Sequence, residues 1–580
     1  MSLEAAARLA LHLAVPPISS AGADWPDERA AGAADSSRLV SILAANKVHL
    51  LSIARRWDER EDPFWREFVT LPEIAAAIRE QASRKAALLG AYLDAAAAMR
   101  AEGIEPVLFK SPAWFPYLSS NLDVLVPPSR FLDAARILER LGHLRLPHYR
   151  EDHKLLYRTF AGGRPALSVH LHEAVSWGKV LILPGEAVVA RRVGGEDSGV
   201  SVASPRDALA ATIAHTIFET DQIRLSDLRI ARRSLIRGAR VEDLIEEAAR
   251  GRWLAAAASG LLLYDGAAEA GGVTLLAPEE RRLAEEALER YPWAARASKR
   301  ILGSAGPCYP FVLPRWFSKE HLVRLVLADD RRDGQRKVFD LGASAWNLVS
   351  ARLRIRCRPA CLITVSGPDG SGKSSVAEAV AAALALCEVP VRTIWSRGGF
   401  SAPAVAGKAL ARRIAPGRVP SRSDERAKRS FLESGWRRAL WTWVVALEQA
   451  AAMQRVRLWR LLGRSVVCDR YVYDTLADLL ARIPPESRQG APAAGGFLLG
   501  ATPTPDLSFI IDVAADVAHA RKGDGTTLEA RRRLAAAYAF LSEVAPFARL
   551  DGEHPLPENL QRAVTESLRR CFARFEEGRL

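Results

Sequence analysis

The spacing of apolar side chains changes along the chain and divides it into four segments. Residues 1–102 repeat apolar residues at helical intervals, as in "IAAAIREQASRKAALLGAYLDAAAAMRAEG", which predicts packing helices that end at Gly103. Residues 103–203 contain short apolar runs separated by Pro and Gly, with one helical stretch, which predicts a small α/β module. Residues 204–358 return to helical spacing, with a break at 303–314 and a connecting helix after it.

Residues 359–580 alternate short apolar runs with longer helical stretches. The expected strands are "CLITVSG", "PVRTIW", "RSVVCD", "DLSFIID" and "FARLDG". Such alternation requires crossover connections and gives a parallel sheet with helices on both faces. We therefore expect a multidomain α/β protein whose N-terminal α/β module is embedded in helices.

The cysteine content, the N-terminal sequence and the net charge indicate which cellular compartment and which ligands to expect. The six cysteines are scattered without metal-type spacing, which favours a reducing cytoplasm. The N-terminal "MSLEAAARLALHLAVPP" has no basic segment before its apolar residues, and no apolar run is long enough to span a membrane, so we expect neither a secretory signal nor a membrane span. The net charge of +14 suits phosphorylated ligands. Nucleic acid is a less favoured partner, because no basic cluster is interleaved with aromatic residues.

The stretch "GPDGSGKSS", residues 367–375, follows an expected strand and opens an expected helix. Gly367, Gly372, Lys373 and Ser374 have the spacing G-x-x-x-x-G-K-[ST] of a phosphate-binding P-loop. In such a loop the backbone N–H groups surround the phosphates, the lysine reaches the β and γ oxygens, and the serine hydroxyl binds Mg²⁺. The alternative is an ordinary glycine turn.

A carboxylate that could hold the metal or its water follows another expected strand. Asp469 comes directly after "RSVVC" and is followed by Arg470 and Tyr471. The carboxyl ends of parallel strands are where ligands bind in such folds. We therefore expect Asp469 to lie near the phosphate loop.

Three stretches together resemble the thymidylate kinase family over roughly residues 359–575: "GPDGSGKSS", "DRY" at 469–471 and "PDLSFIIDVAADVAHARK" at 505–522. The resemblance implies ATP and Mg²⁺ as cofactors, with Ser374 and Asp469 at the metal. It implies Asp369, Arg397 and Arg470 on the acceptor side, and Lys373, Asp469, Arg470, Arg521 and Lys522 as catalytic groups. The ATP phosphate site would consist of Gly367, Pro368, Asp369, Gly370, Ser371, Gly372, Lys373, Ser374 and Ser375.

The chain departs from that family where the acceptor nucleoside would bind. After "DRY" the family has small hydroxyl residues, whereas this chain has "VYDTLADLLARIPP". The residues around 484–500 and the tryptophan-rich "SGWRRALWTWVVALEQ" also differ from a compact thymidylate pocket. A phosphate donor site is therefore expected, and the acceptor stays open.

A second resemblance covers residues 35 to about 300. The stretch "GIEPVLFKSPAWFPYLSSNLDVLVPPSRFLDAARILERLG" resembles the uncharacterised nucleotidyltransferase family, whose pattern is Leu-Lys-Gly followed by Arg and Asp-x-Asp-x-Leu-Val. The matching residues here are Lys110, Ser111, Asn121 and Asp123. Nucleotidyl transfer uses carboxylates that hold two Mg²⁺ ions. Because Asn121 replaces the first carboxylate, we expect a retained fold that serves as a binding or regulatory module, and an active transferase is the alternative.

His170 and His172 lie where a third acidic strand residue would be expected, and Glu173 follows them. Two histidines at i,i+2 share one strand face and could bind a metal. Because the sequence offers no certain third ligand, we expect a packed or surface pair. Glu173 should lie on the opposite face or in the following turn.

The leading hypothesis is an ATP/Mg²⁺-dependent phosphotransferase joined to a nucleotidyltransferase-like module. It would act on a nucleotide and a small phosphorylated or hydroxyl acceptor. One alternative is a nucleotide-binding regulatory protein without turnover of a small molecule. Another, motivated by the charge of +14, is a nucleic-acid end-processing enzyme.

Overall fold

The computed structural model divides into two compact units, which are described separately. The first comprises residues 1–158 and 167–349, and the second comprises residues 159–166 and 350–580. The finer division of residues 1–358 into three segments stays a prediction. None of the described helices combines the length and apolarity that a membrane crossing requires. The residues described are 3–15, 36–57, 68–110, 121–146, 153–177, 180–195, 197, 199–303, 306–328, 333–335, 337–339, 341–342, 345, 349, 360–395, 435–482, 491–521 and 526–577.

The helices predicted for the first hundred residues are present. They are α1 (Leu3–Ala14), α2 (Ser36–Ala45), α3 (Leu50–Trp57) and α5 (Pro72–Ala101). Pro72 begins α5, where its missing N–H costs nothing, and Gly103 follows the helix with a φ of 74°. The predicted end of this helix is therefore confirmed, and its cause is the left-handed conformation that glycine adopts readily.

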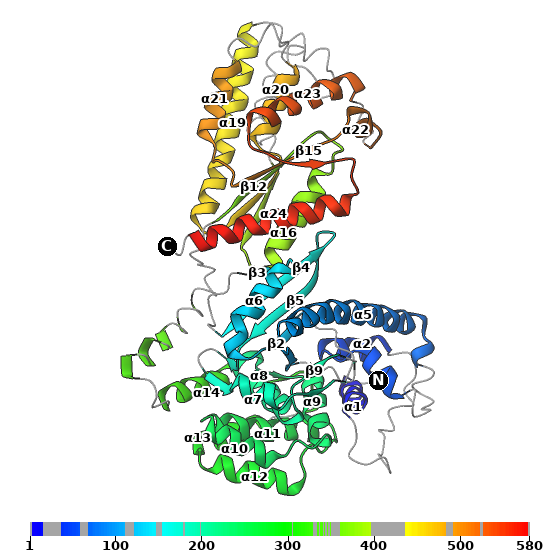
Figure 1. Cartoon of the computed structure of the whole chain (residues 1–580), viewed down its shortest axis with the longest axis vertical. Coiled ribbons are helices and arrows are strands. Elements are labelled where there is room, and N and C mark those ends of the chain that lie inside the picture. Colours follow the sequence, from blue (N-terminus) through cyan, green and yellow to red (C-terminus); the bar gives the residue numbers. More distant parts are fainter. Residues whose placement is uncertain are drawn as a thin grey trace. The chain divides into compact units, whose positions relative to one another are not determined.

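A seven-stranded mixed sheet forms the predicted α/β module (Figure 1). Its centre is the parallel pair β2–β5, in which Asp123 is the register partner of His170. Strand β1 lies on the other side of β2 in antiparallel orientation, and α6 (Phe131–Arg140) follows β2. The strands in spatial order are β3 (Leu144–Leu146), β4 (Lys154–Ala161), β5 (Arg164–His172), β2 (Leu122–Leu125), β1 (Val107–Leu108), β9 (Ser201–Val202) and β8 (Val193–Gly194).

Further helices complete this unit, and their buried apolar residues share one core with α1 and α2. Within the helical spacing predicted for residues 204–358, α10 ends before α11 begins, and Arg252 between them adopts a φ of 64°. The predicted break at 303–314 is confirmed, and it contains β11 (Phe311–Val312), which pairs with β10 (Gln222–Ile223). The helices are α7 (Gly185–Ala190), α8 (Pro205–His215), the π-helix η4 (Thr216–Thr220), α9 (Leu225–Ile236), α10 (Val241–Arg250), α11 (Leu254–Glu269), α12 (Pro278–Glu289), α13 (Pro292–Leu302) and α14 (Arg315–Ala328).

The second unit contains a parallel sheet formed by the five predicted strands. Their spatial order is β13 (Val391–Trp395), β14 (Ser465–Asp469), β12 (Leu362–Ser366), β15 (Leu507–Asp512) and β16 (Ala548–Asp551). In Figure 1, α16 and α24 lie together on one face of the sheet, and α19, α20 and α23 lie on the other. The helices are α16 (Lys373–Leu386), α19 (Gly435–Leu461), α20 (Val472–Arg482), α21 (Ala491–Ala501), α22 (Ala515–Arg521), α23 (Leu528–Val544) and α24 (Leu556–Glu577).

Gly260 of α11 lets this helix approach α8 closely. A Cβ atom at this position would lie 2.3 Å from Ile213 Cγ2. We predict that Gly260→Ala lowers the free energy of unfolding by about 1–3 kcal/mol, because overpacking outweighs the better helix propensity of alanine. The midpoint of thermal unfolding measures the change.

Gly90 provides the matched control, since it lies on the exposed face of α5, and a Cβ atom added there would have nothing within 4 Å. Gly90→Ala should leave the free energy of unfolding unchanged or raise it by up to about 1 kcal/mol. The midpoint of thermal unfolding should accordingly stay the same or increase. Equal stabilisation by both substitutions would show that α8 and α11 do not pack this closely.

Candidate functional sites

The glycine-rich turn, residues 367–372, leads from β12 directly into α16. Gly370 and Gly372 have φ values of 92° and 94°, which glycine adopts without strain. A Cβ atom at Gly367 would lie 2.7 Å from the backbone oxygen of Ile511 on the neighbouring strand. The glycines are therefore required by the backbone path, which brings the chain to the N-terminus of α16, where unpaired N–H groups favour an anion.

Ser374 and Asp469 meet at the carboxyl end of the sheet. The register places Asp469 of β14 beside Val365 of β12, and the Ser374 Oγ donates a hydrogen bond of 2.7 Å to Asp469 Oδ2. The second carboxylate oxygen, Oδ1, is buried and has no hydrogen-bond partner among the described residues. A hydroxyl and a carboxylate are oxygen ligands of the kind that Mg²⁺ takes, usually together with water and phosphate oxygens. The residues present therefore fit this ion.

Lys373 is held over the turn that precedes it. Its side chain is buried, and its Nζ donates to the Pro368 carbonyl oxygen at 2.6 Å and lies 3.4 Å from Asp369 Oδ1. Both partners are oxygen atoms, as are those of a phosphate. The ammonium can thus exchange these contacts for a bound phosphoryl group without a large movement.

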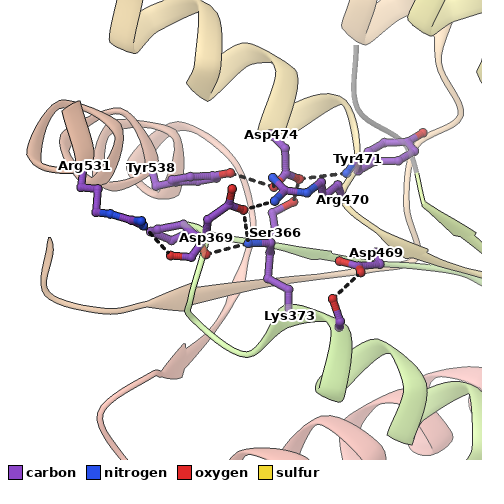
Figure 2. Close-up of polar contacts among 11 residues, drawn as sticks. Ser366, Asp369, Lys373, Asp469, Arg470, Tyr471, Asp474, Arg531 and Tyr538 are labelled. Atoms are coloured by element: carbon purple, nitrogen blue, oxygen red, sulfur yellow. Dashed lines mark hydrogen bonds and ion pairs between the residues drawn. The ribbon is translucent and has the colours of Figure 1, made fainter. Parts of the chain in front are cut away.

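Arg470 joins the turn to helix α20. Its guanidinium contacts Asp369 Oδ1 through Nη2 and lies 3.8 Å from Asp474 Oδ1 through Nη1 (Figure 2). The backbone of Arg470 has a φ of 76°, a left-handed conformation that is uncommon for residues other than glycine. Two of the residues predicted for the acceptor side, Asp369 and Arg470, are therefore in direct contact.

Asp474 is a buried carboxylate that was not among the predicted site residues. Its Oδ2 accepts from Ser366 Oγ at 2.7 Å and from the Tyr471 backbone N–H at 2.9 Å, and its Oδ1 accepts from Tyr538 Oη at 2.7 Å. It thereby connects β12, α20 and α23. The sequence could have indicated this role, because an acidic residue at the third position of a helix often accepts a hydrogen bond from the backbone N–H of the N-cap residue.

Arg531 of α23 was also missed. It is buried, and its Nη1 donates to the Asp369 carbonyl oxygen at 3.1 Å. Helical periodicity places Arg531 and Tyr538, seven residues apart, on one face of α23, but it does not mark Arg531 as a site residue among its neighbours Arg532 and Arg533. Arg521, one of the predicted catalytic groups, donates to the Gly552 carbonyl oxygen at 2.8 Å. Lys522 and Arg397 lie outside the described residues, and the roles of all three stay predictions.

A second group of polar residues lies along the parallel pair β2–β5 in the first unit, where Asp123 is near the start of β2 and His170 and His172 are near the end of β5. Asp123 Oδ1 is 3.2 Å from His172 Nε2, 3.3 Å from His170 Nδ1 and 3.4 Å from Lys110 Nζ. Asp123 is buried, and burial would raise the pKa of its carboxyl group. The charge of Lys110 and the hydrogen bonds from the two histidines overcome that effect and hold the pKa well below its usual value. Burial also lowers the pKa of His172 to about 3, against the attraction of Asp123.

Glu219 adds a second carboxylate to this group. Its Oε2 accepts from Trp177 Nε1 and lies 3.5 Å from both Lys110 Nζ and His215 Nε2. It lies on the π-helix η4, a rare type of element that is frequent at functional sites. Burial raises the pKa of Glu219, but the charges of Lys110 and His215 outweigh it and leave the value at about 2. Glu219 was missed in the sequence because a further acid was expected only on the strands.

The structure adds a potential third ligand to the histidine pair and confirms the expected place of Glu173. The sequence offered no certain third ligand beside the two histidines, but Asp123, His170 and His172 each present one potential ligand atom, all within 4.8 Å of one another. Glu173 lies just after β5, as expected, and contacts His153 rather than Asp123. Asn121 immediately precedes β2, and Ser111 lies outside the described residues.

Comparison with known proteins identifies part of the first unit. Residues 33–266 match the family described as uncharacterised nucleotidyltransferase. The resemblance seen in the sequence is thus confirmed for this span, and a domain of this family indicates a nucleotide-related transferase. No curated protein matches the chain.

We predict that Asp474→Ala destabilises the second unit by at least about 2 kcal/mol. The substitution leaves the hydroxyls of Ser366 and Tyr538 buried without this acceptor and removes the carboxylate near Arg470. Urea denaturation of the full chain, followed by circular dichroism, measures the loss.

Asp516→Ala is the matched control, because Asp516 is exposed and forms only a surface ion pair with Arg532. Such pairs contribute little, so the change should stay within about 0.5 kcal/mol. The same small effect for both substitutions would contradict the role of Asp474 as the buried connection between β12, α20 and α23.

Proposed function

We propose that this protein is a nucleotide-dependent phosphotransferase that binds Mg²⁺ and a nucleoside triphosphate at the glycine-rich turn and transfers the γ-phosphoryl group to a small acceptor. The observation that carries the proposal is the contact between Ser374 and Asp469, with the second carboxylate oxygen of Asp469 buried and without a hydrogen-bond partner among the described residues. Together they supply two oxygen ligands beside the N-terminus of α16.

Each part of the turn has a distinct task in this proposal. The N–H groups at the start of α16 would bind the β-phosphate, and Lys373 would exchange its contacts with Pro368 and Asp369 for β and γ oxygens. Mg²⁺, when bound through Ser374 and Asp469, would neutralise charge on the same phosphates. Phosphoryl transfer needs chiefly such positioning and charge neutralisation.

The acceptor would bind on the side of the turn where Arg470 and Arg531 lie. Arg470 contacts the side chain of Asp369, and Arg531 contacts its carbonyl oxygen, so two guanidinium groups adjoin one residue of the turn. Guanidinium groups bind phosphate through paired hydrogen bonds. This arrangement favours an acceptor that carries a phosphate, such as a nucleoside monophosphate, and is compatible with a thymidylate kinase-like reaction. The departures after "DRY" give no support to dTMP itself.

The matched family supports a nucleotide-related role for the first unit as well. We propose that this domain binds a nucleotide or regulates the chain and does not perform Mg²⁺-dependent nucleotidyl transfer. The reason is that Asn121 and the two histidines replace groups that would carry negative charge toward two Mg²⁺ ions.

We predict that Lys373→Met and Ser374→Ala each reduce turnover at least about 100-fold, by analogy with the loss of one preorganised charge-stabilising group. Ser374→Ala should also weaken the dependence of the rate on Mg²⁺, since it removes a metal ligand. The assay follows transfer of the labelled γ-phosphoryl group to a panel of nucleoside monophosphates and other small acceptors.

Ser542→Ala is the control for Ser374→Ala, because the Ser542 hydroxyl is exposed and donates only to the Ala539 carbonyl oxygen on α23. It should leave turnover unchanged. Tight ATP binding without transfer to any acceptor would instead favour the regulatory alternative, and full activity in folded Lys373→Met would refute the proposed site.

A further inference from the structure

The polar group around Asp123 does not suit the two Mg²⁺ ions that its family implies. Mg²⁺ requires oxygen ligands in near-octahedral geometry. On β5, the register partner of Asp123 is His170, and His172 lies two residues further along the same strand face. These are nitrogen donors, and Asn121 offers no negative charge. The residues of this chain therefore form a different kind of site from that of a two-metal transferase.

The distances from Asp123 to the two histidine nitrogens suit one small metal ion with tetrahedral coordination. In a tetrahedral site with metal–ligand bonds of about 2.0–2.1 Å, neighbouring ligand atoms lie about 3.3 Å apart. Asp123 Oδ1 lies 3.3 Å from His170 Nδ1 and 3.2 Å from His172 Nε2. All three ligand atoms lie within 4.8 Å of one another, and the two distances from Asp123 already have the length that this geometry requires.

We propose that Asp123, His170 and His172 bind one divalent transition-metal ion of the Zn²⁺ class, with a fourth position open to water or a ligand. Imidazole nitrogen is a preferred ligand of Zn²⁺ and of its neighbours Co²⁺ and Ni²⁺, and a poor one for Mg²⁺. A set of three protein ligands and one open position is typical of Zn²⁺ sites that act on a bound molecule.

Lys110 sets the affinity of this site. Its ammonium lies 3.4 Å from Asp123 Oδ1, on the same oxygen that both histidines contact, and therefore opposes a bound cation. Glu219 Oε2, at 3.5 Å, gives the ammonium a second partner to which it can turn when a metal binds. The hydrogen bond from Trp177 holds Glu219 in place for that exchange. Removal of the Lys110 charge should therefore tighten metal binding.

The ring of His172 is positioned by packing as well as by its hydrogen bond. Phe109 contacts it edge to face with ring centroids 4.9 Å apart, and the histidine side chain is 3% exposed. A ligand whose orientation is fixed before binding loses less freedom when the ion arrives. This arrangement favours binding of a metal by the folded chain rather than by a flexible surface.

The test uses the full-length, chelator-treated chain without an affinity tag, in a Cys308→Ser background that removes an exposed thiol. Calorimetry with Zn²⁺ should show one ion per chain, and Co²⁺ should give the visible absorption of a four- or five-coordinate site. Excess Mg²⁺ should not displace Co²⁺. His170→Ala, His172→Ala and Asp123→Asn should each weaken binding at least about 100-fold, beyond the roughly 10–100-fold range known for supporting residues.

Two further variants make the test specific. His153→Ala should leave binding unchanged, because His153 contacts Glu173 and not Asp123. Lys110→Met should tighten metal binding. If the polar group had only a structural role, this substitution would not raise the affinity for a metal ion. Absence of a stoichiometric Co²⁺ spectrum in the parent chain, displacement by Mg²⁺, or equal affinity in folded His172→Ala would each overturn the proposal.

Discussion

Parallel strand pairing is the constraint on which both candidate sites depend. Register partners on adjacent parallel strands project side chains from the same face at the same level. In the second unit the pairing of Val365 with Asp469 brings a carboxylate beside the glycine-rich turn. In the first unit the pairing of Asp123 with His170 brings together a carboxylate and an imidazole. A slip of one residue in either pair would send these side chains to the opposite face.

The glycine-rich turn is supported by a buried network behind it. Asp474 accepts hydrogen bonds from three elements, and it lies near Arg470, which contacts Asp369 of the turn. Buried charges are costly unless they are paired, so this network tolerates little rearrangement. It fixes Asp369 through Arg470, while Ser374 and Asp469 present the oxygen atoms that we propose bind a metal.

Local patterns predicted much of this arrangement, and long-range contacts determined the rest. The five strands of the second unit, the turn and Asp469 could be predicted, because each depends on apolar spacing or on a motif within a few residues. Arg531 and Glu219 could not, since nothing local distinguishes Arg531 from its neighbours Arg532 and Arg533, and Glu219 reaches its partners through a π-helix. The role of His170 and His172 depended on Asp123, which lies 47 and 49 positions away along the chain.

The two sites differ in the ions that their atoms favour. Ser374 and Asp469 offer oxygen, whereas His170 and His172 offer nitrogen, so we propose Mg²⁺ for the second unit and a Zn²⁺-class ion for the first. The central claim is that Asp469 couples nucleotide binding to Mg²⁺. The most direct test is the affinity of the full chain for a fluorescent ATP analogue, measured with and without Mg²⁺, in the parent protein and in Asp469→Asn. We expect Mg²⁺ to tighten binding in the parent and to have little effect in Asp469→Asn, which still binds the phosphates through the turn. An undiminished Mg²⁺ effect in folded Asp469→Asn would contradict the claim.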